Sequence, residues 1–281
     1  MIDSFAERWA LITGASSGIG VEFARKLAER GMHLVLTARR KELMEQLASE
    51  LDTKHGARCE IITGDLSDPA QPKKLFDEIK NAGISVELLV NNAGFSVVDE
   101  IDKTNVDRVL AMVSLNIAAL TELSYLFLPE MLERGHGAIV NVSSVAGFQP
   151  VAYMGAYAAS KAYVLHFSEA LWAEAREQGV TVMALCPGTT RTDFFAQAGI
   201  PGWLKKHRSQ TPEQVVRAAL KALSKKRQYI VSGWRNYLLS LAVRLATRRT
   251  AVTESMKYFR PAPSRDDLPD AQQDTPQTED R

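Results

Sequence analysis

The sequence contains very little cysteine. Cys59 and Cys186 are far apart and lack the short spacing of a redox pair or a zinc site. We therefore expect no disulfide scaffold and no metal centre, and we interpret both cysteines as ordinary buried residues. The N-terminal segment MIDSFAERWALITG also lacks the basic region and the long apolar run of a signal peptide. These absences predict a protein of a reducing, cytoplasmic compartment.

Neither sign of charge dominates the chain, because 34 Lys and Arg oppose 33 Asp and Glu. The distribution is nevertheless uneven. Residues 205–249 carry many Lys and Arg and a single acid, Glu213, whereas the last twenty residues are mostly acidic and polar. The basic segment could favour an anionic surface. It contains no pattern of stacking aromatics and no recognition helix, so we do not expect nucleic-acid binding.

Apolar segments of strand length alternate with amphipathic segments of helix length. The expected strands are residues 9–13, 33–37, 59–63, 87–91, 138–142 and 180–186. In a chain of 281 residues with 46% apolar content, this alternation predicts one α/β domain, a doubly wound parallel sheet of the Rossmann type. Such sheets bind ligands at the carboxyl ends of their strands, so the residues that follow strands are the functional candidates.

We divide the chain into three parts. Residues 1–232 form the catalytic domain, in which 188–210 is a substrate loop and Thr211 is the N-cap of the next helix. Residues 233–260 form an amphipathic helical extension, and residues 261–281 form a disordered acidic tail.

The segment 233–250 of the extension has two different faces. It is too short and too interrupted to span a bilayer. We expect its apolar face to pack on the domain or on a second subunit, and the alternative is peripheral contact with an anionic membrane. The polar strip contains Asn236, Ser240, Arg244 and Arg248, and the apolar face contains Tyr237, Leu238, Leu241, Ala242 and Leu245.

A glycine-rich turn, TGASSGIG, follows the first expected strand and has the spacing GxxxGxG at the start of a helix. Glycines allow a sharp turn and a close approach to a pyrophosphate, and the helix N-terminus offers unpaired N–H groups. We predict that the turn binds the diphosphate of a dinucleotide; the alternative is a turn without a ligand. The residues assigned to this contact are Gly14, Ser16, Ser17, Gly18, Ile19 and Gly20.

The second expected strand is followed by Ala38, Arg39 and Arg40. A site specific for NAD would place Asp or Glu here to bind the ribose 2′-hydroxyl. A small neutral residue and an arginine instead favour a 2′-phosphate, so we predict NADP(H) with Arg39 as its ligand. Arg40 is either a second ligand or the start of a solvated helix.

Tyr157 and Lys161 lie four residues apart in YAASK and share one face of the expected helix 157–178. A close cation together with an oxidised nicotinamide would lower the phenol pKa from about 10 toward neutrality. Ser144 follows the strand 138–142 and could also reach a substrate carbonyl oxygen. Ser143 is the alternative, because only one of two neighbouring side chains on an extended strand faces the site.

Seven motifs occur in a characteristic order: TGASSGIG, Asp65-Leu66, NNAG (91–94), Asn116, Ser144, YAASK and Pro187-Gly188. On these motifs, residues 5–232 resemble the short-chain dehydrogenase/reductase family. Residues 233–250 look like the C-terminal extension of its bacterial, broad-specificity subgroup. The resemblance implies an oxidoreductase that transfers a hydride between NADP(H) and a ketone, an aldehyde or a secondary alcohol.

The resemblance also implies roles for individual residues. The catalytic set would be Asn116, Ser144, Tyr157 and Lys161, with Asn116 positioning a water linked to the lysine. The implied cofactor ligands are Asp65 and Leu66 at the adenine, Asn92, Ala93 and Gly94 along the adenosine and ribose, Tyr157 and Lys161 beside the nicotinamide ribose, and Pro187, Gly188, Thr190 and Thr192 around the nicotinamide and a phosphate.

Apolar and aromatic residues flank the catalytic groups and predict a hydrophobic small-molecule substrate. We assign Ser144, Phe148, Tyr153 and Phe194 to the substrate site, with Phe95, Val145, Phe195 and Trp203 as further candidates. Two other functions stay open, a nucleotide-dependent epimerase or dehydratase and a cofactor-sensing binding protein. We expect a homodimer or homotetramer that pairs through helices within 103–134 and 157–178.

Overall fold

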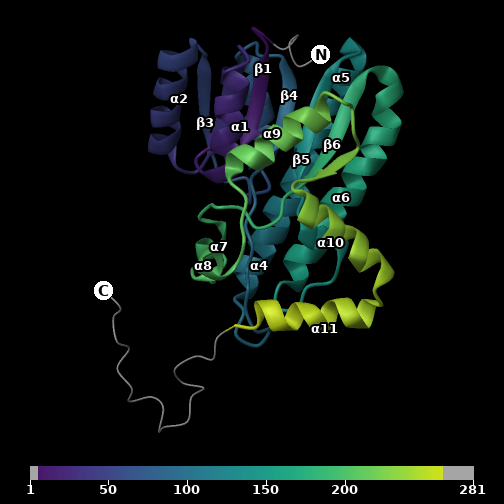
Figure 1. Ribbon diagram of the computed structural model, residues 1–281. Coiled ribbons are helices and arrows are strands. Elements are labelled where there is room, and N and C mark those ends of the chain that lie inside the picture. Colours follow the sequence, from purple (N-terminus) through teal and green to yellow (C-terminus); the bar gives the residue numbers. More distant parts are fainter. Residues whose placement is uncertain (1–5, 262–281) are drawn as a thin grey trace.

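Seven parallel strands form the central sheet of the structure, a computed structural model that describes residues 6–261 (Figure 1). The strand order is β3-β2-β1-β4-β5-β6-β7, so the winding direction reverses between β1 and β4. This confirms the predicted doubly wound sheet. The strands are β1 (Trp9–Thr13), β2 (His33–Ala38), β3 (Cys59–Thr63), β4 (Val86–Asn91), β5 (Gly137–Val142), β6 (Val180–Cys186) and β7 (Tyr229–Val231).

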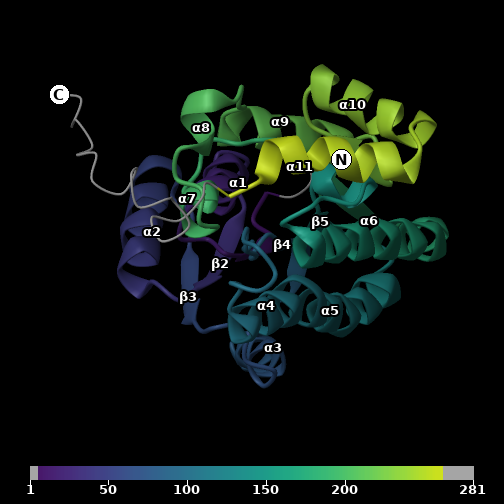
Figure 2. The same cartoon turned by 90° about the horizontal axis from the view of Figure 1, so that it is seen from below.

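Helices connect the strands and cover both faces of the sheet (Figure 2). The longest expected helical stretch contains a π-helical segment, Ser114–Ala119, between two α-helices. The α-helices are α1 (Gly18–Ala28), α2 (Lys41–His55), α3 (Gln71–Asn81), α4 (Val106–Val113), α5 (Leu120–Arg134), α6 (Gly155–Ala175), α7 (Phe194–Gln197), α8 (Trp203–Lys206), α9 (Pro212–Leu223), α10 (Trp234–Leu245) and α11 (Arg248–Phe259).

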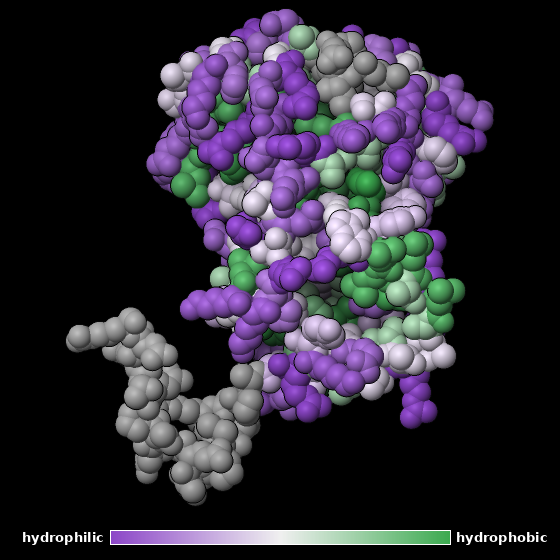
Figure 3. Space-filling view, in the orientation of Figure 1, coloured by the Kyte–Doolittle hydropathy of each residue, from purple (hydrophilic) through white to green (hydrophobic). Residues whose placement is uncertain are grey.

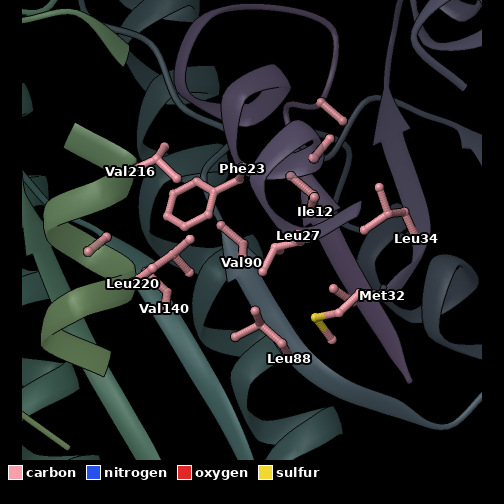
Figure 4. Packing of buried hydrophobic residues seen from close by; sticks show 14 of the residues in the cluster. Ile12, Phe23, Leu27, Met32, Leu34, Leu88, Val90, Val140, Val216 and Leu220 are labelled. Atoms are coloured by element: carbon pink, nitrogen blue, oxygen red, sulfur yellow. The ribbon is translucent and has the colours of Figure 1, made fainter. Parts of the chain in front are cut away.

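Alternate residues of the strands point into two separate hydrophobic clusters, one on each face of the sheet. On one face, Phe23 of α1 points toward Val216 and Leu220 of α9, above Ile12 and Val90 of the strands (Figure 4). The opposite face packs α3, α5 and α6 on the intervening strand residues. Burial on both faces explains why the strands read as continuous apolar runs.

The six expected strands agree with β1 to β6 to within one residue at each end. Thr211 is the N-cap of α9, as predicted, and it forms a capping box with Gln214. The sequence analysis missed β7, which has only three residues.

The C-terminal extension differs from the prediction in two respects. It contains two helices rather than one, and Thr247 caps the second of them. The apolar face of α10 does not pack on its own domain, because the buried side belongs to the polar strip: Ser240 is buried, while Tyr237 and Leu238 are exposed. Residues 262–281, which include almost all of the predicted acidic tail, lie outside the described part of the chain.

Among the described residues, the continuous helical stretch Val106–Arg134 is long and apolar enough to cross a membrane. Its residues Leu123, Phe127 and Met131 are buried against the sheet. We therefore assign this stretch to the core of the domain.

Four polar side chains form a buried network between the sheet and the helices α5 and α6. Asn91 Nδ2 donates to Asn141 Oδ1 at 2.9 Å and to Ser124 Oγ at 3.2 Å, and Asn141 Nδ2 donates to Ser168 Oγ at 3.0 Å. Because Asn91 and Asn141 are paired in neighbouring strands, the network joins β4 to β5 close to the carboxyl ends of both strands.

We expect Asn141→Leu to lower the free energy of unfolding by about 1–3 kcal/mol, because one amide N–H of Asn91 then stays buried without an acceptor. Urea denaturation measures the change. The double variant Asn91→Leu/Asn141→Leu removes donor and acceptor together and should cost less than the sum of the two single variants. Simple additivity of the two costs would contradict a coupled network.

Candidate active site

A cavity of about 370 Å³ opens where the strands end at the carboxyl edge of the sheet. It runs from the glycine-rich turn and Arg39 to Trp203 and Phe259 near the C-terminus. Most of the predicted site residues line it: Gly14, Ser16, Ser17, Gly18, Ile19, Arg39, Asp65, Leu66, Asn92, Ala93, Gly94, Ser144, Tyr157, Lys161, Pro187, Gly188, Thr190, Thr192 and Phe194.

The glycine-rich turn has the shape that a dinucleotide needs. Gly14 and Gly18 have φ of 66° and 55°, values that side chains with a Cβ rarely adopt. Gly20 lies behind the turn rather than in the cavity wall, and a Cβ there would meet Gly14 O at 2.3 Å. Ser17 is the N-cap of α1 and makes no side-chain cap bond, so the first N–H groups of the helix are available to an anion. The residues present therefore fit a dinucleotide diphosphate.

Both arginines after β2 line the cavity, but they make different contacts. Arg39 Nη1 lies 3.6 Å from Asp65 Oδ2, and its side chain is largely exposed. Arg40 donates to Ser16 Oγ at 3.1 Å and to Ser16 O at 3.3 Å. Arg40 thus holds the glycine-rich turn in place, a role that the sequence analysis did not assign to it.

The structure distinguishes the two candidate serines. Ser143 is buried and donates to Lys161 O at 2.6 Å. Ser144 accepts a hydrogen bond from Ala146 N at 3.1 Å, and its hydroxyl lies close enough to the phenol of Tyr157 to lower the pKa of that phenol. Of the two hydroxyls, that of Ser144 is therefore the one paired with Tyr157.

Lys161 and Asn116 lie deeper than the Ser144–Tyr157 pair. Lys161 Nζ donates to Val142 O at 2.8 Å and lies 5.7 Å from the centroid of the Tyr157 ring. Asn116, in the π-helical segment, binds the backbone of Phe95 through both amide atoms, at 3.2 and 3.0 Å. A π-helical insertion commonly marks a functional position, and here it directs the asparagine to the loop that follows β4.

Aromatic residues form the wall opposite the glycine-rich turn. The ring of Phe194 lies 5.6 Å from that of Tyr157, and Phe195 stacks on Trp203. Trp203 also stacks on Phe259 of α11, at 4.6 Å and an interplanar angle of 8°. The sequence analysis missed Phe259, because it lies far along the chain from every motif.

Two predicted substrate residues do not line the cavity. Phe148 belongs to the 3₁₀ turn Val145–Phe148 and packs against Tyr229 and the guanidinium of Arg244, beneath α10. The Tyr153 hydroxyl accepts a hydrogen bond from Arg260 at 3.2 Å, outside the cavity lining. Their placement does not support the assignment, which stays a prediction, because nearness in sequence to Ser144 and Tyr157 does not determine where a side chain points. Met154 lines the cavity instead of Tyr153.

The profile of the family described as short chain dehydrogenase matches residues 8–200. The chain belongs to the short-chain dehydrogenase family. A very-long-chain 3-oxoacyl-CoA reductase from Anas platyrhynchos is 36% identical over 222 residues, covering 75% of this chain and 67% of the relative. A 7beta-hydroxysteroid dehydrogenase from Mediterraneibacter gnavus is 30% identical over 231 residues, covering 81% and 87%.

Similarity to solved structures extends over nearly the whole chain. The short-chain dehydrogenase from Sphingobium yanoikuyae in complex with NADPH superimposes with a TM-score of 0.77 and 32% identity, over 92% of this chain and 98% of that one. The chain is thus an oxidoreductase of a nucleotide-binding family that acts on alcohol and carbonyl groups.

Burial shifts Tyr157 and Lys161, the two titratable residues of the candidate catalytic set, toward their neutral forms. Burial raises the pKa of Tyr157 to about 12, although its hydrogen bond with Ser144 acts in the opposite direction. Burial lowers the pKa of Lys161 to about 8. The protein alone therefore does not lower the phenol pKa, and the expected shift toward neutrality also counted on the charge of an oxidised nicotinamide. A phenol that keeps its proton near neutral pH is suited to donating it.

We expect Lys161→Met to raise the free energy of unfolding of the cofactor-free enzyme at pH 7 by about 1–3 kcal/mol. Burial lowers the pKa of Lys161 to about 8 from the ordinary lysine value of 10.5, so the folded state disfavours the charged form. Loss of the bond to Val142 offsets part of the gain.

The sign of this effect sets its pH dependence. Below pH 8 the lysine is protonated in the folded and in the unfolded protein, and the folded protein bears the full free-energy cost of burying the charge. Between pH 8 and 10.5 only the unfolded protein keeps the proton. The stability of the parent should rise with pH in this window, and its difference from Lys161→Met should shrink. Urea denaturation across this range, with the exposed lysine variant Lys225→Met as control, tests the expectation; a pH-independent difference would contradict it.

Proposed function

We propose that this enzyme reduces a hydrophobic ketone or aldehyde with NADPH, and oxidises the matching alcohol in reverse. The observation that carries the proposal is that Ser144 and Tyr157 line one cavity with Phe194, Trp203 and Phe259. Two hydroxyl donors beside an aromatic wall suit a carbonyl oxygen on an apolar body. With a pKa raised by burial, Tyr157 keeps its proton, as a proton donor in the reducing direction must.

The proposed chemistry needs one proton donor and one further hydrogen bond to the substrate oxygen. When bound, NADPH supplies the hydride for the carbonyl carbon. Tyr157 donates its phenolic proton to the oxygen as the alkoxide forms, and the Ser144 hydroxyl donates a hydrogen bond to the same atom. Lys161, with a pKa of about 8, is the nearest buried group that can return a proton to Tyr157. Asn116 fixes the Phe95 loop beside these groups.

We assign NADP(H) rather than NAD(H) on the residues that surround the expected ribose position. Arg39 and Arg40 line this end of the cavity, and the carboxylate there, Asp65, is paired with Arg39. An exposed guanidinium can take a 2′-phosphate bidentately, whereas NAD-specific sites place a carboxylate on the 2′-hydroxyl. The similarity to a structure in complex with NADPH supports the assignment.

The substrate proposal rests on the aromatic wall and agrees with the relatives. Phe195, Trp203 and Phe259 stack in nearly parallel planes, at interplanar angles of 15° and 8°. A flat or extended apolar substrate would pack against such a wall. Relatives named for 3-oxoacyl-CoA and hydroxysteroid substrates are consistent with this class.

We further propose a cytoplasmic homodimer or homotetramer. Tyr125 of α5 and Tyr163 of α6 are exposed and lie on either side of Phe167, at 5.9 and 5.5 Å between ring centroids. This aromatic surface supports pairing through the helices within 103–134 and 157–178.

We expect Tyr157→Phe to lower the rate of NADPH oxidation with a hydrophobic ketone by about 10²- to 10⁴-fold, because the proton donor is removed. NADPH binding, read by its fluorescence, should stay within a few-fold of the parent. The matched control is Tyr153→Phe, which removes a phenol outside the cavity and should keep full activity. An epimerase or dehydratase would convert substrate without net NADPH consumption, and a binding protein would be indifferent to Tyr157→Phe; either result would refute the proposal.

We expect Arg39→Asp to raise KM for NADPH by about tenfold or more and to improve the relative use of NADH. The variant replaces a charge-assisted hydrogen bond with repulsion between Asp and the 2′-phosphate, each worth roughly 1–3 kcal/mol. Steady-state kinetics with both cofactors measure the change. Lys54→Asp, the same charge change at the far end of α2, should leave the preference unaltered. Equal use of NADH by the parent enzyme would overturn the cofactor assignment.

A further inference from the structure

The helix α10 presents its apolar face to solvent. Trp234 and Leu245 are 70% and 91% exposed, and Tyr237, Leu238 and Leu239 are about half exposed. Figure 3 shows a hydrophobic, green patch at the right edge of the molecule, in the region where Figure 1 draws α10. We call these five residues the α10 patch. A surface helix normally buries its apolar face, so other contacts must hold α10 in the opposite orientation.

The polar strip of α10 holds the helix in this orientation. Asn236 Nδ2 donates to Gln210 Oε1 at 3.2 Å and to Ser232 O at 2.7 Å, and Gln210 Oε1 also accepts from Ser232 Oγ at 2.8 Å. The side chain of Asn236 occupies the space beside Gly188, where a Cβ would lie 2.4 Å from it. Rotation of the helix to bury the α10 patch would break these bonds and open a gap beside the cavity wall. The outward position of the patch is therefore built into the fold.

Positive charges lie beside the α10 patch. Arg235 is next to Trp234 and its guanidinium lies 5.3 Å from the indole, and Arg248 and Arg249 begin α11 directly after the patch, whereas Arg244 lies against Phe148 beneath the helix. The sequence contains no Asp or Glu between Gln214 and Thr253. Exposed apolar residues with Trp and Tyr, bordered by arginines and free of acids, are complementary to an anionic lipid surface.

A second copy of the chain fits the α10 patch less well. If the patch lay on the two-fold axis of a dimer it would face itself, which would bring the arginines of both copies together without an acidic residue to pair them. A lipid surface supplies anionic headgroups in any number.

We propose that the α10 patch docks the enzyme on anionic membranes, with the leucines and Trp234 at the level of the acyl boundary and the arginines at the headgroups. This docking is independent of the proposed reaction, since it needs neither cofactor nor substrate.

Vesicle co-sedimentation of the full chain tests the proposal, with phosphatidylcholine vesicles that contain or lack phosphatidylglycerol. We expect binding to the anionic vesicles, a blue shift of Trp234 fluorescence that is absent in Trp234→Phe, and weaker binding to neutral vesicles. Leu238→Gln/Leu245→Gln should weaken binding by at least about tenfold, because two apolar side chains no longer enter the lipid. Arg248→Ser/Arg249→Ser should weaken binding to anionic vesicles by roughly tenfold or more and leave binding to neutral vesicles unaltered.

The matched control is Ile101→Gln/Val106→Gln, which removes two exposed apolar side chains outside the α10 patch and should bind vesicles like the parent. Circular dichroism verifies that all variants are folded. Light scattering separates membrane docking from self-association. The proposal is overturned if the parent does not bind anionic vesicles, if both double apolar variants lose binding equally, or if Leu238→Gln/Leu245→Gln dissociates an oligomer without changing vesicle binding.

Discussion

The buried ammonium group of Lys161 is the constraint around which the site is arranged. The ammonium donates to Val142 O at the end of β5, and the backbone carbonyl of Lys161 accepts a hydrogen bond from the Ser143 hydroxyl. A Cβ on Gly147 would meet that carbonyl at 2.7 Å, and a Cβ on Gly94 would lie 3.4 Å from the ammonium. The 3₁₀ turn can approach the Lys161 carbonyl this closely because it offers a glycine, and the loop after β4 approaches Asn116 in the same way, since a Cβ on Gly94 would lie 2.8 Å from Asn116 Oδ1. Lys161 thus contacts the end of β5 through its ammonium and the 3₁₀ turn through its backbone.

The sequence predicted the sheet and the polar half of the site well, for identifiable physical reasons. Parallel strands buried on both faces are continuous apolar runs, so β1, β2, β4, β5 and β6 were visible as apolar segments, and the more exposed β3 was recognised by its place in the alternation. The glycine-rich turn and the Tyr157–Lys161 pair depend on local spacing within one turn or one helix. The structure places them in one cavity, and their roles there remain proposals.

The apolar half of the site depends on contacts that spacing does not encode. Phe148 and Tyr153 are close in sequence to catalytic candidates, yet neither of them lines the cavity. Phe259 reaches the cavity because α10 ends at Leu245 and the next helix, α11, brings Phe259 onto Trp203 of α8. The amphipathic pattern of α10 indicated which face is apolar but not which face is buried, because the outcome depends on hydrogen bonds to Gln210 and Ser232.

The contribution of Phe259 to the cavity divides the enzyme into parts that can change independently. The groups around Lys161 lie on β5, α6 and the loops between them, whereas part of the opposite wall lies on the last described helix. A substitution at Phe259 would therefore change the shape of that wall without altering any residue of β5 or α6.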